Sequence, residues 1–327
     1  MAMGGLGEFL AAAVAAPVSL TTDRLAVMLA ADDEVFDGEL FAAAREVKHR
    51  VGKDAVLPRG LVECSNVCDK DCLYCGIRRS SAACRRYRLT EAEAVAAIGE
   101  VRRRGYPAVA FQAGELESEA NTVYYEHLLA QCRGLEVTLS LGEQTEAVYR
   151  RWREAGALRY LLRIETSNRS LYAKIHPAAC SFDRRLNCIR TLKRLGYVTG
   201  SGVMIALPGQ TVRDLAEDIG FFADERLDMV GMGPYVPHPG TPLFSATETI
   251  RAPEVRLRLA LRMIALVRLR LPAINIVAAT ALSALDSEAG RERGLAAGAN
   301  VIMPNLTPPL ARSAYDLYPG AIFFSDK

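Results

Sequence analysis

The chain has 327 residues, half of them hydrophobic, and a formal net charge of +2 at pH 7. This length and apolar content are sufficient for one large buried core. A charge so close to zero gives no electrostatic footprint for nucleic acid or an anionic membrane, so we expect neither as a partner. The Ala-rich N-terminus lacks a basic segment and contains Glu8, which is not typical of a signal peptide. Eight unevenly spaced cysteines favour a reducing compartment, and we predict a cytoplasmic protein without a membrane span.

Two helical segments open the chain. Leu25, Met28 and Leu29 recur at helical spacing, and a similar apolar pattern runs from Phe36 to His49. Both segments precede the first predicted strand. We therefore expect residues 1–55 to form an N-terminal helical extension that covers one end of a barrel domain formed by residues 56–327.

From Leu57 onward, short apolar segments alternate with amphipathic ones. The predicted strands are Leu57–Cys64, Ala108–Phe111, Leu135–Leu141, Arg159–Thr166, Val198–Leu207, Met229–Pro234, Ile274–Ala281 and Asn300–Pro304. The predicted helices are 90–105, 123–132, 145–155, 183–195, 214–225, 253–271 and 287–297, the first opened by a capping box. This alternation over about 250 residues is typical of a TIM (β/α)8 barrel, an α/β fold with its chemistry at the carboxyl ends of the strands.

A cysteine-rich loop follows the first predicted strand. Cys68, Cys72 and Cys75 have the spacing C-x3-C-x2-C, which is too tight for an ordinary disulfide framework and can bring three thiolates to one metal centre. A [4Fe–4S] cluster usually takes four thiolates, so one iron would stay open for a ligand. Cys64 could complete a structural zinc site. However, a second Cys-x-x-Cys knuckle is missing and Cys64 lies in an apolar run, so we favour the cluster.

The cysteine spacing, with Tyr74 directly before Cys75, resembles the signature of radical S-adenosylmethionine (SAM) enzymes. The flanking text E-C-S-N-V-C-D-K-D-C-L-Y-C-G-I-R-R, together with R-Y-L-L-R, L-P-G-Q-T and N-V-I-M-P-N, is similar to the HydE family of [FeFe]-hydrogenase maturases. The resemblance extends from about Leu20 to Phe324. It implies a [4Fe–4S] cluster on the three cysteines and SAM on the open iron. One electron would cleave SAM to methionine and a 5′-deoxyadenosyl radical, which a closed barrel protects from water.

The resemblance also implies a substrate and partners. The radical would act on a cysteine-bound iron carbonyl cyanide synthon, an organometallic small molecule supplied by HydG, and the product would pass to the scaffold HydF. Transient contacts with both proteins are therefore expected during assembly of the diiron subcluster. Two related alternatives are a methylornithine synthase (PylB-like) mutase and a biotin synthase-like enzyme. A non-catalytic metal-binding or scaffold protein is the alternative from another class.

Polar or glycine-containing segments follow several predicted strands, and the resemblance assigns them to SAM. The backbone at Gly114 would meet the SAM amino group, and Arg185 would pair with its carboxylate, a task that suits a guanidinium. Residues 200–211 resemble the stretch that packs the adenine, with Ala206 in place of a glycine. The implied SAM-binding residues are Tyr74, Gln112, Gly114, Glu115, Thr138, Ser140, Glu165, Arg185, Met204 and Leu207.

Arg163 and Glu165 project to one face near the end of the fourth predicted strand. They could form an ion pair that only braces the barrel, or they could contact a ligand. We favour ligand contact because both lie at the catalytic end. The resemblance implies Arg163, Met229, Met303 and Tyr315 as catalytic residues, and Arg59, Arg159 and Thr280 as residues of the substrate cavity. The chain departs from many relatives at Ile164 and Ala279.

Overall fold

The computed structural model describes residues 3–315 and residue 317. Its centre is an eight-stranded parallel sheet with the order β10-β1-β2-β3-β4-β5-β7-β9. These strands are β1 (Leu57–Ser65), β2 (Ala108–Ala113), β3 (Glu136–Ser140), β4 (Arg159–Leu161), β5 (Val198–Ser201), β7 (Met229–Val230), β9 (Asn275–Ile276) and β10 (Val301–Ile302).

The sheet closes on itself. β9 and β10 are the ends of the strand order, and Val277 and Val301 form a parallel bridge between them. The Asn300 amide donates to the Ile276 carbonyl at 3.0 Å, and the Ala278 amide donates to the Val301 carbonyl at 2.9 Å. Closure satisfies the backbone groups that an edge strand would expose. The predicted (β/α)8 barrel is therefore confirmed.

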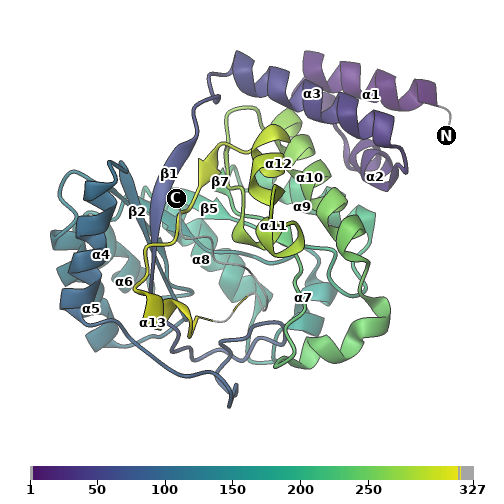
Figure 1. Cartoon of the computed structure of the whole chain (residues 1–327). Coiled ribbons are helices and arrows are strands. Elements are labelled where there is room, and N and C mark those ends of the chain that lie inside the picture. The colour runs from purple at the N-terminus through teal and green to yellow at the C-terminus, as the bar shows by residue number, and fades with distance from the viewer. Residues whose placement is uncertain (1–2, 316, 318–327) are drawn as a thin grey trace.

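Helices cover the outside of the barrel (Figure 1). They are α4 (Glu91–Arg103), α5 (Glu119–Ala130), α6 (Glu146–Glu154), α7 (Arg169–Ile175), α8 (Phe182–Arg194), α9 (Val212–Asp224), α10 (Pro253–Arg270), α11 (Thr280–Leu285), α12 (Gly290–Ala296) and α13 (Pro309–Arg312). Thr90 caps α4 through the predicted capping box, and Thr211 caps α9 in the same way with Asp214. Buried aromatic side chains fill the layer between sheet and helices, where Trp152 stacks with Tyr160 at 6.5 Å. None of the described helices combines the length and apolar composition that crossing a membrane requires.

The helices α1 (Met3–Ala15), α2 (Thr22–Ala30) and α3 (Glu34–Arg50) precede β1 and lie at the end of the barrel where β1 begins (Figure 1). They pack against α9 and α10. Arg262 of α10 is 1% exposed, pairs with Asp37 and donates to the Leu29 carbonyl at 3.2 Å. The cysteine loop starts at the opposite end of β1, so these helices lie away from the predicted site.

Two predicted strands, Val198–Leu207 and Met229–Pro234, are each divided in the structure. Beyond β5 and β7, the short strands β6 (Met204–Ile205) and β8 (Gly233–Pro234) pair separately in a two-stranded sheet. The breaks face each other, because a Cβ atom on Gly202 would lie 1.9 Å from the Gly231 carbonyl oxygen. Only glycine permits this approach.

Two other predicted strands are shorter than expected. The strand predicted to reach Thr166 ends at Leu161, because the chain then turns and Glu165 adopts a φ of 68°. The strand predicted to reach Ala281 ends at Ile276, and Thr280 instead begins α11. Both early ends lie beside the cavity described below, where the chain leaves the sheet to present side chains.

Candidate active site

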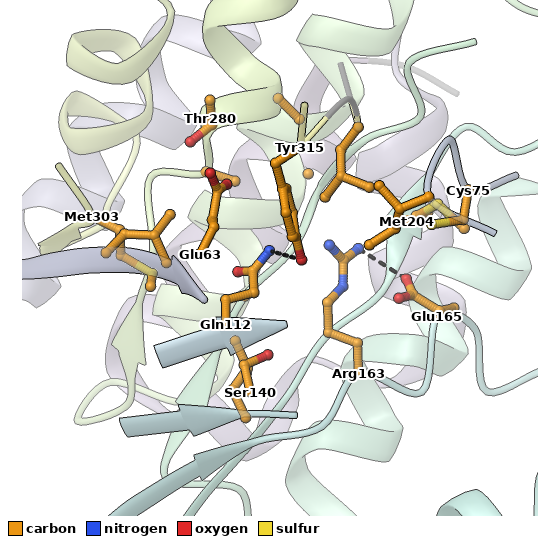
Figure 2. Close-up of a pocket in the computed structure, with 18 of the residues that line it drawn as sticks. Glu63, Cys75, Gln112, Ser140, Arg163, Glu165, Met204, Thr280, Met303 and Tyr315 are labelled. Atoms are coloured by element: carbon orange, nitrogen blue, oxygen red, sulfur yellow. Dashed lines mark hydrogen bonds and ion pairs between the residues drawn. The ribbon is translucent and has the colours of Figure 1, made fainter. Parts of the chain in front are cut away.

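A cavity of about 320 Å³ lies at the carboxyl ends of the strands (Figure 2). Most of the predicted site residues line it. They are Cys68, Cys72, Tyr74, Cys75, Gln112, Gly114, Glu115, Ser140, Arg163, Glu165, Arg185, Met204, Thr280, Met303 and Tyr315. The fold therefore brings together residues from the cysteine loop, from several strand ends and from the C-terminal segment, as the barrel prediction required.

The cysteine loop is fixed against the end of β2. The Glu115 amide donates to Cys68 Sγ at 3.3 Å, and Lys70 Nζ lies 3.0 Å from Glu115 Oε1. A Cβ atom on Gly114 would lie 2.3 Å from the Val67 carbonyl oxygen and 2.7 Å from Cys68 Cβ. Gly114 is thus required by the contact with the cysteine loop, whatever its predicted role toward SAM.

The three motif thiols fit a [4Fe–4S] cluster. Burial raises the pKa of Cys75 to about 12; a backbone hydrogen bond from Ile77 opposes the rise, and the charge of Cys68 adds to it. Within the described residues, no three Cys, His, Asp or Glu side chains are grouped to hold a single metal ion. Each thiolate of a four-iron cluster binds a different iron, so cluster ligands stand farther apart than the ligands of one ion. Cys68, Cys72 and Cys75 all line the same cavity, so their thiols could hold a cluster whose open iron faces that cavity.

The alternative four-cysteine zinc site is not formed. Cys64 is fully buried in the outer hydrophobic core with Tyr124 and Tyr125, and its Sγ lies 3.6 Å from the Val62 carbonyl oxygen. Successive residues of a strand point to opposite faces, so Cys64 is directed away from the barrel interior. Cys180, for which the sequence indicated no role, instead interacts with Cys72. The hydrogen bond between these thiols raises the pKa of Cys72 and lowers that of Cys180 to about 7.

A network of charged groups lies next to the cysteine loop. Arg185 Nε lies 2.6 Å from Glu143 Oε1, and Arg185 Nη2 lies 3.7 Å from Glu115 Oε2. The Glu143 amide donates to Glu115 Oε2 at 2.8 Å, and Lys70 lies 3.8 Å from Glu143. Burial raises the pKa of Glu115, although Arg185 opposes this. Arg185 is therefore held in place by carboxylates before any ligand arrives, and Glu143 is a site residue that the sequence analysis missed.

Arg163 and Glu165 form an ion pair of 3.0 Å, and both line the cavity (Figure 2). The pair can therefore brace the barrel and also face a ligand in the cavity. Glu165 is held in the left-handed region by backbone bonds to Gly202 and Met204, each 3.0 Å long. A non-glycine residue in this region is a strained feature that clusters at functional sites. Burial raises the pKa of the Glu165 carboxyl.

Tyr74 contacts a histidine that the sequence analysis did not single out. The Tyr74 hydroxyl lies 3.3 Å from His176 Nε2, and the His176 ring stacks on Tyr172 at 3.9 Å. Burial lowers the pKa of His176 to about 4, so the ring is neutral at neutral pH. Tyr74 also packs against a small apolar cluster formed by Leu171, Ile175, Met204, Leu207 and Tyr235.

The remaining predicted site residues do not line the cavity. Leu207 lies in the apolar cluster just described, and its neighbour Ala206 has a φ of 64°, which explains why glycine suits that position in the family pattern. Arg59, Arg159 and Met229 lie at or near the amino ends of their strands, and Thr138 lies in the middle of β3. Arg59 Nη1 lies 3.5 Å from Met229 Sδ, and Arg159 Nη1 lies 2.5 Å from Glu136 Oε2. Their roles toward SAM or substrate remain predictions.

Comparisons with known proteins place this site in a family. A model described as "Radical SAM superfamily" matches residues 62–222. Over 313 residues the chain is 42% identical to the [FeFe] hydrogenase maturase subunit HydE of Thermotoga maritima, covering 94% of this chain and 86% of the relative. It is 27% identical over 293 residues to 3-methylornithine synthase of Methanosarcina barkeri, covering 88% and 80%.

Solved structures share the fold. Methylornithine synthase (PylB) superposes with a TM-score of 0.80 at 24% identity, covering 92% of this chain and 86% of that one. The maturase HydG from Carboxydothermus hydrogenoformans superposes with a TM-score of 0.75 at 20% identity, covering 91% and 71%. The motif cysteines line the cavity, and the chain is 42% identical to a HydE protein over nearly its whole length. The protein therefore belongs to the HydE family of radical SAM enzymes.

Proposed function

We propose that this protein cleaves SAM reductively in the assembly of the diiron subcluster of [FeFe]-hydrogenase, with a cysteine-bound iron carbonyl cyanide synthon as its substrate. The observation that carries the proposal is the joint position of the motif cysteines, Arg163, Glu165 and Arg185 on the wall of one cavity. The identity of 42% to the HydE relative, against 27% to a methylornithine synthase and 30% to a biotin synthase, favours this function over the two related alternatives.

Cys68, Cys72 and Cys75 would hold the [4Fe–4S] cluster. When bound, the cluster and SAM supply a one-electron cleavage that yields methionine and a 5′-deoxyadenosyl radical. The chain's own residues would position the cluster and SAM and protect the radical from side reactions. Lys70 holds the cysteine loop to Glu115, and Arg185 presents a guanidinium whose orientation Glu143 sets. A preformed guanidinium suits a carboxylate ligand, because little side-chain freedom remains to be lost on binding.

We propose that the cavity wall also limits the access of water to the reacting groups. Tyr315 is 4% exposed, and Gln112 Nε2 donates to its hydroxyl at 3.2 Å (Figure 2). This bond joins the segment after α13 to the end of β2, and both side chains line the cavity. A covered, partly apolar cavity would keep a carbon radical from side reactions. We propose that Met303 and Thr280, on the same wall, contact the substrate.

We further propose the domain division predicted from the sequence, with a helical extension at residues 1–55 and the barrel domain at residues 56–327. Residues 1, 2, 316 and 318–327 of this division lie outside the described part. The proposed partners are a small organometallic substrate and, transiently, HydG and HydF. Neither nucleic acid nor a membrane is proposed as a partner. The proposed compartment is the cytoplasm.

The test is electron paramagnetic resonance of the anaerobically reconstituted, reduced protein with and without SAM, together with chromatography of 5′-deoxyadenosine. The expected result is a [4Fe–4S]+ signal that shifts on addition of SAM. Cys72→Ala should abolish the signal, whereas Cys132→Ala should keep it because Cys132 is a buried thiol near the end of α5. Stoichiometric zinc without a cluster signal would contradict the proposal.

A further inference from the structure

One buried acid on the cavity wall was not predicted from the sequence. Glu63 lies on β1, is 7% exposed and lines the cavity. Figure 2 shows its side chain extending from β1 toward the side of the cavity where Thr280 and Tyr315 lie. A carboxyl group in this position needs a polar partner, because burial of an unpaired charge is costly.

The orientation of the Glu63 carboxyl group is fixed by the segment that follows β10. Asn305 Nδ2 donates to Glu63 Oε2 at 2.9 Å, and Thr307 Oγ1 lies 3.4 Å from the same oxygen. Thr307 is itself held, because its Oγ1 accepts from the Glu63 amide at 2.8 Å and its amide donates to Asn305 Oδ1 at 2.9 Å. The carboxyl group is therefore held rigidly from one side.

The other oxygen of Glu63, Oε1, accepts no hydrogen bond from the described residues. Burial raises the pKa of Glu63 to about 7, although the bond from Asn305 and the charge of Arg312 act against this rise. A held carboxyl group with one open oxygen is an acceptor that a ligand can complete.

The cavity also contains groups of the opposite charge. Arg163 lines it from the end of the fourth strand and is paired with Glu165, and Arg312 lines it near Glu63. A ligand with both an amino group and an anionic group would suit this wall, because the amino group could contact the Glu63 carboxyl group and the anionic group could contact Arg163 or Arg312. An α-amino acid has this pair of groups.

We propose that Glu63 binds the amino group of the substrate's amino-acid moiety by accepting an N–H hydrogen bond at Oε1. The assignment rests on the proposed function, in which the substrate carries a cysteine ligand. An amine that also coordinates a metal keeps N–H donors, so the contact serves a free or an iron-bound amino group. The alternative is that Glu63 only braces the Asn305 segment through Oε2.

Two probes that differ only in the amino group separate these roles. S-methyl-L-cysteine and 3-(methylthio)propionate are titrated anaerobically by calorimetry into the cluster-loaded protein with SAM. We expect wild type to bind the amino acid about 10-fold or more tightly than its deamino analogue, the usual effect of one charge-assisted hydrogen bond. Glu63→Gln, which still accepts from Asn305, should lose this preference. The matched control Asp218→Asn changes a buried carboxyl group of α9 outside the cavity and should keep it.

Every other outcome overturns the assignment. Equal binding of the two probes in wild type, binding of neither, or a preference that survives in Glu63→Gln would each leave Glu63 as a brace. The wild-type comparison stands even if the variant does not fold. Failure of the proposed function is a separate result, because a cluster signal that shifts with SAM and the release of 5′-deoxyadenosine are measured without either probe.

Discussion

Replacement of Gly114 by alanine tests whether the cysteine loop depends on its contact with β2. The new Cβ atom would lie 2.3 Å from the Val67 carbonyl oxygen, 2.8 Å from the Val67 carbonyl carbon and 2.7 Å from Cys68 Cβ. To restore an ordinary contact of about 3.4 Å, the backbone at Val67 must retreat by about 1 Å. This backbone carries Cys68, so the shift displaces a predicted cluster ligand.

We expect the overpacked Gly114→Ala protein to lose about 1–3 kcal/mol of stability. For a chain of this size, that corresponds to a fall in Tm of about 2–6 °C. Iron content after reconstitution should fall more sharply, because cluster binding needs all three thiols in place. The measurements are thermal unfolding followed by circular dichroism and iron per chain.

The matched control is Gly99→Ala. Gly99 lies within α4, and a Cβ atom there would meet nothing within 4 Å. Alanine in a helix is favoured over glycine by roughly 0.5–1 kcal/mol, so Tm should rise slightly and iron content should stay unchanged. The argument fails if Gly114→Ala binds a full complement of iron at an unchanged Tm.

Three further predictions concern buried charges. Arg262→Ala leaves the Asp37 carboxylate and two backbone carbonyls without their donor, so urea unfolding should show a loss of about 3–5 kcal/mol. Glu143→Gln weakens the ion pair that orients Arg185, so the Kd for SAM should rise by about 10-fold. The Kd is measured by calorimetry on the cluster-loaded protein, and an unchanged value would refute the role of Glu143. Burial raises the pKa of Asp218 to about 7, so the folded protein binds this proton more tightly than the unfolded chain does. The stability that the protonated Asp218 contributes should therefore be lost as pH rises from about 4 to 7. Asp218→Asn should flatten the pH dependence of urea unfolding in that window, and equal slopes would count against the assignment.

The barrel could be predicted because its signals are local. Strand patterns and capping residues such as Thr90 are read over a few positions, and they predict the eight alternating units, although not the short helices α7, α11 and α13. The division of the strands after Ser201 and Val230 could not be predicted in this way. It arises where Gly202 meets Gly231, and that contact joins residues far apart in the sequence.

The site residues also divide into those with a local sequence signal and those brought in by contacts between distant segments. The cysteine motif is contiguous, and the structure places all three of its thiols on the cavity wall. His176 and Cys180 lie around the end of α7, without any spacing that points to Tyr74 or Cys72. Their contacts depend on how α7 packs against the loop, so only the folded chain reveals them.

The alternation along β1 shows that strand periodicity can predict, residue by residue, which side chains face the barrel interior. Leu61 and Glu63 line the cavity, whereas Val62 and Cys64 belong to the outer hydrophobic core. This period of two removes Cys64 from any metal site and turns Glu63 inward. A single acid at an inward position of a buried strand is costly unless the interior is polar there, so the same pattern that excludes a fourth cysteine ligand indicates a polar site at Glu63.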